Sequence, residues 1–175
     1  PQVVAIGECG LDYNRDFSPR NVQRSVLRRQ LALAEKLNLP VYLHERDASD
    51  DMINILTEFN VRGVLHCFTG DENALKSYLA LGLYIGITGW VCDERRGQAL
   101  QALAPSIPLN RLLIETDAPF LIPRTVKPKP KSRRNEPALL THVCQTLAEL
   151  YQIDAKSVAK QTTDNFYAVF GLEAR

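Results

Sequence analysis

Short apolar runs alternate along the chain with longer segments whose apolar residues recur every three or four positions. The runs are typical of buried parallel strands, and the longer segments have the period of amphipathic helices. We expect strands at residues 3–9, 41–44, 61–66, 83–88 and 111–116. Regular alternation of the two patterns predicts an α/β fold with a parallel sheet.

The residues around the helical segments indicate where the helices begin and end. Ser18 and Pro19 are expected to be the N-cap and the first helical position of the first helix, which ends before Pro40. Gly82 follows the third helix, where glycine is a common stop. The remaining helical segments are 47–59, 71–81, 93–104, 137–151 and 154–170.

Length, composition and charge narrow the class of protein. A chain of 175 residues that is 45% hydrophobic suits one globular domain, which we assign to residues 1–175. The net charge of +1 argues against a polybasic nucleic-acid binder, and no apolar run approaches the ~20 residues of a membrane span. The four widely spaced cysteines form no C-x-x-C pair, so we expect reduced thiols in a cytoplasmic protein.

Four potential metal ligands sit at the ends of four separate apolar runs. They are Glu8, His44, His66 and Asp117. Each has an ordinary alternative, such as a hydrogen-bonded core histidine or an acid that caps a turn. The carboxyl ends of parallel strands meet at one edge of a sheet or barrel, so together the four predict a pocket for a divalent cation. Carboxylate and imidazole ligands leave Mg²⁺, Mn²⁺ and Zn²⁺ open, as one ion or two.

Such a site is typical of metal-assisted hydrolysis. A bound cation lowers the pKa of water and neutralises an oxyanion. Asp117 would orient or deprotonate that water, and Glu8 would bridge two cations. Strand alternation turns Glu115 to the same side as Asp117. There it would accept a hydrogen bond from a ligand imidazole, or form an ion pair deeper in the barrel.

The segment after the last expected strand points to a phosphate-bearing substrate. Residues 118–137 contain five prolines and one acid, Glu136, and are strongly basic in a nearly neutral chain. Proline stiffens such a loop, and its cations would attract phosphates unless it is only a solvated surface loop. Arg46, two residues after His44, could reach a phosphate or pair with Asp47. The cations of the loop are Arg124, Lys127, Lys129, Lys131, Arg133 and Arg134.

Six ordered motifs resemble the TatD family of metal-dependent deoxyribonucleases. They are Gly-Glu-Cys-Gly-Leu-Asp (7–12), Leu-His-Glu-Arg-Asp (43–47), Leu-His-Cys-Phe-Thr-Gly (65–70), Ile-Gly-Ile-Thr-Gly-Trp-Val-Cys-Asp-Glu-Arg-Arg-Gly (85–97), Ile-Glu-Thr-Asp-Ala-Pro (114–119) and Ser-Arg-Arg-Asn-Glu-Pro (132–137).

The resemblance implies a (βα)8 TIM barrel of the metal-dependent hydrolase superfamily. It also implies a cytoplasmic, Mg²⁺-dependent 3′→5′ exonuclease that acts on DNA, with RNA as a further substrate, in DNA repair and degradation. It gives metal-ligand roles to Glu8, His44, His66 and Asp117, and places Arg46 and the segment Arg133, Arg134 and Asn135 near the substrate.

The chain also departs from the family pattern. Only about the last five strand-helix units of such a barrel are present, so we expect the amino-terminal strands, and the His-x-His pair that many members carry, to be missing from this sequence. Two alternatives follow. One is an amide or lactone hydrolase of the same superfamily, which the basic loop disfavours, and the other is an inactive truncated fragment.

Overall fold

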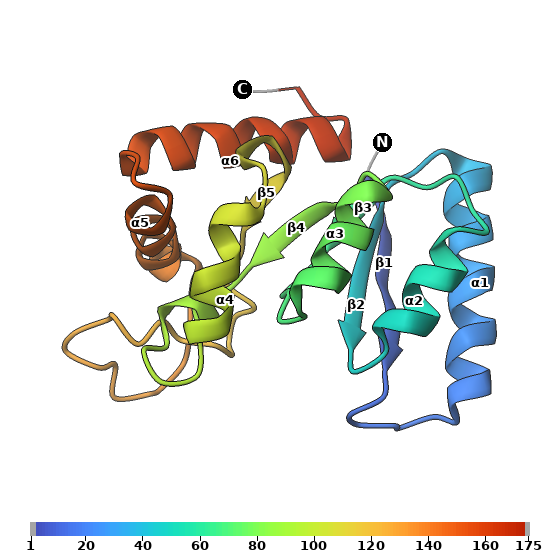
Figure 1. Cartoon of the computed structure of the whole chain (residues 1–175), viewed down its shortest axis with the longest axis horizontal. Helices are drawn as coiled ribbons and strands as arrows, with labels where there is room; N and C mark the ends of the chain where they lie inside the picture. The colour runs from blue at the N-terminus through green and yellow to red at the C-terminus, as the bar shows by residue number, and fades with distance from the viewer. Residues whose placement is uncertain (1–2, 174–175) are drawn as a thin grey trace. The chain divides into compact units, whose positions relative to one another are not determined.

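The computed structural model describes residues 3–173, in which strands and helices alternate (Figure 1). The strands are hydrogen-bonded in chain order, β1-β2-β3-β4-β5, which confirms the expected α/β class. They are β1 (Ile6–Asp12), β2 (Val41–Arg46), β3 (Gly63–Leu65), β4 (Tyr84–Ile87) and β5 (Leu112–Ile114). The α-helices are α1 (Arg20–Leu37), α2 (Ser49–Leu56), α3 (Glu72–Ala80), α4 (Gln98–Leu103), α5 (Leu140–Tyr151) and α6 (Ala155–Phe170).

The chain divides into two compact units. The first contains the residues up to Ile85 together with those from Phe166 onward, and the second contains Gly86–Asn165. In the first unit, β1 pairs in parallel with β2, β2 with β3, and β3 with the start of β4. Helices α1 and α2 pack against β1 and β2 and against each other, as Figure 1 shows.

The second unit is built around β5 and the end of β4. The Glu115 N–H donates to the Ile87 carbonyl at 3.0 Å, so the pairing continues one residue past β5. Asn165 is buried and donates to the carbonyls of Leu109 and Leu112, at 2.9 and 2.7 Å, which anchors the entry to the strand. Short 3₁₀ helices occupy Gly89–Cys92, Ala104–Ser106, Leu109–Arg111 and Pro137–Leu139.

Several element boundaries differ from the sequence expectation. β1 lies three residues later than expected, and Val3 is exposed. Ser18 does not cap α1, because Pro19 is the N-cap and no side chain bonds to the open amides there. The segment 93–104 is helical only from Gln98, since Asp93 accepts the Arg95 and Arg96 amides and closes a turn first.

Helix α1 carries apolar residues on two faces, and only one of these faces is buried. Leu27, Leu31 and Ala34 are fully buried, whereas Val22, Val26 and Leu37 belong to an exposed stripe on another side of the helix. The helix ends at Asn38 in the left-handed conformation. The other expected stop, Gly82 after α3, has a φ of 78° and is confirmed.

Neither a membrane-spanning helix nor a disulfide occurs among residues 3–173. No helix of residues 3–173 is both long enough and apolar enough to span a membrane. All four cysteines lie in this described part, and none of them forms a disulfide there. Three of them, Cys9, Cys92 and Cys144, are buried, while Cys67 is half-buried.

One ion pair makes the stability of the first unit depend on pH. The Tyr13 hydroxyl donates to Asp51, and Arg24 Nη1 lies 2.9 Å from the same carboxylate. Both contacts favour the ionised acid and hold the pKa of Asp51 below its ordinary 3.8. A depressed folded-state pKa adds stability above the unfolded-state value, and that stability is lost as the pH falls through the folded-state value.

We therefore expect Arg24→Ala to lower the free energy of unfolding at neutral pH only slightly, because the pair is partly exposed. Urea unfolding at pH 7 and below pH 3.8 measures this, and the deficit of the variant is expected to shrink at acid pH. Arg29→Ala, an exposed neighbour on the same helix, is the control. An equal deficit at both pH values would contradict the account.

Candidate metal centre

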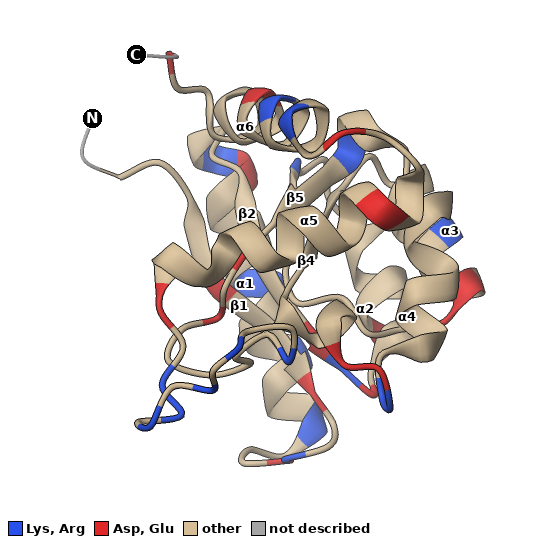
Figure 2. Ribbon diagram, turned by 90° about the vertical axis from the view of Figure 1, so that its left-hand side faces the viewer, with Lys and Arg blue, Asp and Glu red and all other residues tan. Residues whose placement is uncertain are grey.

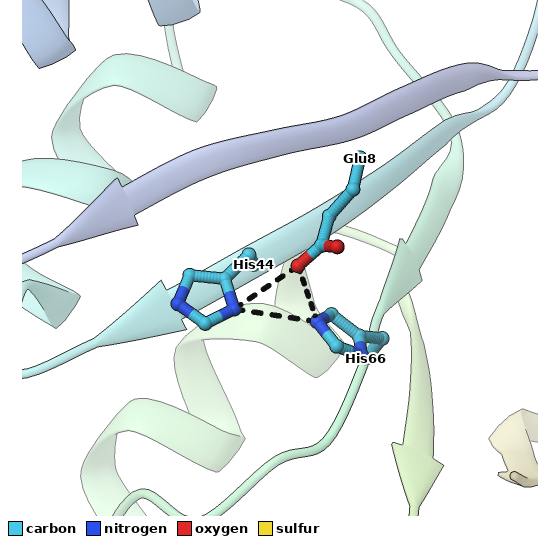
Figure 3. A group of neighbouring side chains, drawn as sticks. All are labelled: Glu8, His44 and His66. Atoms are coloured by element: carbon cyan, nitrogen blue, oxygen red, sulfur yellow. Dashed lines mark hydrogen bonds and ion pairs between the residues drawn. The ribbon is translucent and has the colours of Figure 1, made fainter. Parts of the chain in front are cut away.

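Three of the predicted ligands converge within the first unit. Glu8 lies in β1, His44 in β2, and His66 directly follows β3, so that three adjacent strands each supply one donor (Figure 3). A carboxylate oxygen of Glu8 and one ring nitrogen of each histidine all lie within 4.8 Å of one another. The structure thus brings these three predicted ligands together, and their binding of a metal stays a prediction.

Two backbone features bring the donors together. The β1–β2 register pairs Gly7 with Tyr42 and Cys9 with Leu43, so Glu8 is an extra residue in a bulge. A bulge re-aims one side chain without disturbing the pairing on either side. Farther along, a Cβ on Gly10 would lie 1.8 Å from the His44 carbonyl oxygen, so only glycine permits this close approach of β1 to β2.

The donor atoms form a tight triangle. Glu8 Oε1 lies 2.8 Å from His66 Nε2 and 3.2 Å from His44 Nδ1, and the two ring nitrogens are 3.3 Å apart. Figure 3 shows these three contacts. His66 is buried, His44 is half-buried and Glu8 is exposed, so the triangle has one side open to solvent.

This geometry fits a transition-metal or similar divalent cation. Ligand atoms held at ~2.1 Å by one ion lie roughly 2.9–3.4 Å from one another, and the three observed separations are close to that interval. Three protein donors with an open side are also the usual number for a catalytic rather than a structural metal site. The residues present therefore fit a cation, and they do not select which one.

Asp12 fixes the orientation of the His44 ring. Its Oδ2 lies 3.0 Å from His44 Nε2. Partial burial alone would raise the pKa of Asp12, but hydrogen bonds from the Arg15 and Asn14 amides and from His44 lower it. An ionised carboxylate only accepts hydrogen bonds, so Nε2 carries the proton and the Nδ1 lone pair faces the triangle.

Sequence reasoning did not assign Asp12 to the site. The signal was available, because Asp12 closes the same motif as Glu8 and lies four residues farther along one strand. Strand alternation places residues four apart on the same face. The apolar pattern predicts a strand that ends at Cys9 and puts Asp12 in the following loop, whereas β1 extends to Asp12.

Contacts of the backbone and one ring hold His66. Its N–H donates to the Leu43 carbonyl at 2.9 Å, which continues the β2–β3 pairing beyond β3. Its ring stacks on Tyr42, with ring centroids 5.2 Å apart. The Cys9 thiol, next to Glu8, is buried, and burial and the Glu8 carboxylate raise its pKa to about 11.

The other two acids of the prediction belong to the second unit. Asp117 follows β5, is exposed, and has a φ of 54° in the turn that the Phe120 N–H closes onto the Asp117 carbonyl. The Glu115 carboxylate lies over Gly86, where an added Cβ would come within 2.2 Å of its oxygen. Metal ligation by Asp117 and support of a ligand by Glu115 stay predictions.

Asn135 organises the basic loop that joins β5 to α5, drawn in orange in Figure 1. Its side chain is buried and donates to the carbonyls of Thr116 and Phe120, at 2.8 and 2.7 Å. Its backbone N–H donates to the Pro119 carbonyl at 3.0 Å. These bonds tie the end of the loop to the residues on both sides of Asp117.

Five of the six cations of this loop are exposed, and Figure 2 colours every Lys and Arg blue. Arg124 pairs with Glu94 at 3.2 Å. The other five, among them Arg133 and Arg134, make no ion pair with any residue of the described range 3–173. Arg46 is likewise exposed, and it makes no ion pair with Asp47, which accepts from Asn14 instead. Substrate contacts of these arginines and of Asn135 stay predictions.

Solved structures share this fold. The chain superposes on the TatD homologue YjjV of Escherichia coli K12 with a TM-score of 0.87 and 30% identity, covering 98% of this chain and 65% of that one. A hydrolase of the TatD family from Entamoeba histolytica gives a TM-score of 0.86 and 30% identity, covering 95% of this chain and 63% of that one. The fold and donor set therefore define a TatD-like α/β hydrolase, as expected from the sequence.

The sequence comparisons identify the family. The signature of the family described as TatD related DNase matches residues 1–171, and this chain belongs to that family. It is 54% identical over 175 residues to a "3′-5′ ssDNA/RNA exonuclease TatD" of Erwinia tasmaniensis and 52% identical over 178 residues to one of Rahnella sp.. These alignments cover 98% and 100% of this chain and 68% of each relative, so the chain spans about two thirds of their length.

The metal-binding role of the triangle is testable with the histidines. We expect Mn²⁺ or Zn²⁺ to bind the protein in calorimetry, and His66→Ala to weaken binding by at least about 10-fold, because even groups that only support ligands have effects of that size. His142→Ala is the matched control, since its ring bonds to Thr125 outside the triangle. Equal metal affinity in the two variants would rule out the triangle as the site.

The anchoring role of Asn135 predicts a stability effect. Asn135→Ala leaves two carbonyls without their donor, and we expect a loss of about 1–3 kcal/mol in the free energy of unfolding. Limited proteolysis is expected to cut the variant between residues 118 and 137 sooner than the parent protein. Arg134→Ala, an exposed neighbour, is the control. Unchanged unfolding and cleavage in Asn135→Ala would contradict the role.

Proposed function

We propose that this protein is a metal-dependent exonuclease that hydrolyses phosphodiester bonds from the 3′ end of single-stranded DNA or RNA. The observation that carries the proposal is the donor triangle of Glu8, His44 and His66. It is supported by membership of the TatD related DNase family and by relatives named 3′-5′ ssDNA/RNA exonucleases. Because those relatives are longer than this chain, the activity of the whole protein is part of the proposal.

Within this proposal, one or two divalent cations would be held by Glu8, His44, His66 and Asp117, with Mg²⁺ the expected ion and Mn²⁺ or Zn²⁺ as alternatives. A bound cation would supply positive charge that acidifies water and stabilises the negative charge developing on the phosphate. Asp117 orients the attacking water and takes up its proton, and Asp12 keeps the His44 Nδ1 lone pair directed at the site. Glu115 is proposed to support a ligand.

Exposed arginines are proposed to bind the phosphates of the nucleic-acid strand. Arg46, Arg133 and Arg134 are exposed and unpaired among the described residues, so their charges are available to phosphates. Asn135 contributes by fixing the backbone on both sides of Asp117. A lactone or amide substrate carries no comparable negative charge, so it would not make use of the positive charge of this loop.

The cellular role follows from the same chemistry. We place the protein in the cytoplasm, supported by four cysteines that form no disulfide in the described part of the chain. An enzyme that shortens single strands from their 3′ ends would act in DNA repair and in DNA degradation.

A labelled strand tests the activity. Incubation of a 5′-labelled single strand with the protein and Mg²⁺ is expected to give a ladder of products that shorten one nucleotide at a time, and a chelator is expected to stop it. Asp117→Asn and Glu8→Gln are expected to lower the rate by at least about 100-fold, the scale of losing one group that stabilises developing charge.

Asp50→Asn, an exposed acid on α2, is the matched control and is expected to cleave at the parent rate. Intact DNA and RNA with every cation tested would sink the proposal. Turnover of a lactone or amide panel by the same preparation would then favour the alternative chemistry.

A further inference from the structure

The basic loop contains a pocket that the proposed catalytic residues do not use. It has a volume of about 220 Å³ and lies entirely within residues 122–133. Its apolar lining comes from Ile122, Pro123, Val126 and Pro130. The cationic residues Lys129 and Arg133 also line it.

Two short turns form the walls. In the first, the Val126 N–H donates to the Pro123 carbonyl at 3.1 Å, and in the second, the Arg133 N–H donates to the Pro130 carbonyl at 3.1 Å. Each turn begins with a proline, whose ring fixes one backbone torsion. Arg124 also lines the pocket. Its ion pair with Glu94 links the first turn to the segment that follows the 3₁₀ helix Gly89–Cys92. The pocket is therefore largely formed before any ligand arrives, which lowers the entropic cost of binding.

Two of the three cationic side chains that line the pocket have no ion-pair partner among residues 3–173. Arg124 is paired, but Lys129 and Arg133 are exposed and make no ion pair or side-chain hydrogen bond within residues 3–173. Apolar walls beside two unpaired cations suit a ligand that has a flat apolar face and an attached anion. A nucleotide has both, because its base stacks on apolar or cationic surfaces and its phosphate attracts Lys and Arg.

We propose that this pocket holds one nucleotide of the single-stranded substrate, with its base against Ile122 and the two prolines and its phosphate at Lys129 and Arg133. The volume is below the 300–1,000 Å³ of sites for drug-sized ligands, so it accommodates a single base rather than a stretch of strand. This proposal rests on the proposed function, because it gives the exonuclease a second grip on its strand apart from the donor triangle.

Binding without cleavage tests the charges. Affinity for a fluorescent single strand of about a dozen nucleotides is measured in the presence of a chelator. The double variant Lys129→Gln/Arg133→Gln is compared with Lys127→Gln/Lys131→Gln, which removes the same charge from the same loop but from residues outside the pocket. We expect the first pair to weaken binding at least about fivefold more than the second, the low end of what stacking and contact with one base contribute.

An abasic scan tests the base. A single abasic position is moved along the strand, and one position is expected to cost about fivefold in affinity because its base no longer fills the pocket. That penalty is expected to disappear in Ile122→Ala and to persist in Leu121→Ala, a half-buried neighbour that does not line the pocket.

The outcomes separate this proposal from the proposed function. Equal weakening by the two charge pairs, or an abasic penalty that Ile122→Ala retains, would overturn the pocket proposal while leaving the exonuclease intact. Absence of metal-dependent cleavage would overturn the function and is measured separately, because the binding assays contain chelator. Urea unfolding of every variant confirms that it is folded before its affinity is compared.

Discussion

The structure depends on the close convergence of three donors from three adjacent parallel strands. The Asp12 carboxylate accepts a hydrogen bond from His44 Nε2, and His44 Nδ1 lies 3.2 Å from Glu8 Oε1 and 3.3 Å from His66 Nε2. Glu8 Oε1 and His66 Nε2 lie 2.8 Å apart, within hydrogen-bond distance. A divalent cation would use all three donor atoms at once, which a hydrogen bond between two of them does not.

The backbone accommodates this convergence at particular positions. The bulge at Glu8 shifts one side chain relative to the strand pairing, and the absence of a Cβ at Gly10 allows β1 to pass close to the His44 carbonyl. Local departures from regular structure of this kind are expected where function rather than stability sets the geometry.

The sequence predicted the strand-helix order and three members of the site because those depend on local patterns. Apolar runs and helical spacing are set by residues close together in the sequence. Glu8, His44 and His66 lie at the ends of such runs, so their positions could be predicted. The bulge that orients Glu8 depends on the pairing of β1 with β2, which no local pattern encodes. The place of Asp12 beside His44 likewise depends on β1 extending three residues beyond its expected end. The segment 93–104 was predicted helical throughout, but the turn that Asp93 closes replaces its first residues, and that competition between side chain and backbone has no periodic signal.

The candidate metal ligands and the cations of the basic loop belong to different segments of the chain, so substitutions in the two should have different effects. The donor triangle is complete within the first unit, whereas the unpaired cations of the basic loop and the buried Asn135 that anchors it belong to the second. Affinity for a cation is set by donors about 3 Å apart and falls steeply when one is lost, while attraction of a strand by exposed Lys and Arg is spread over many charges and screened by salt. Substitutions at the triangle should therefore act through the metal and be insensitive to ionic strength. Substitutions in the loop should act on strand affinity and weaken as salt is raised.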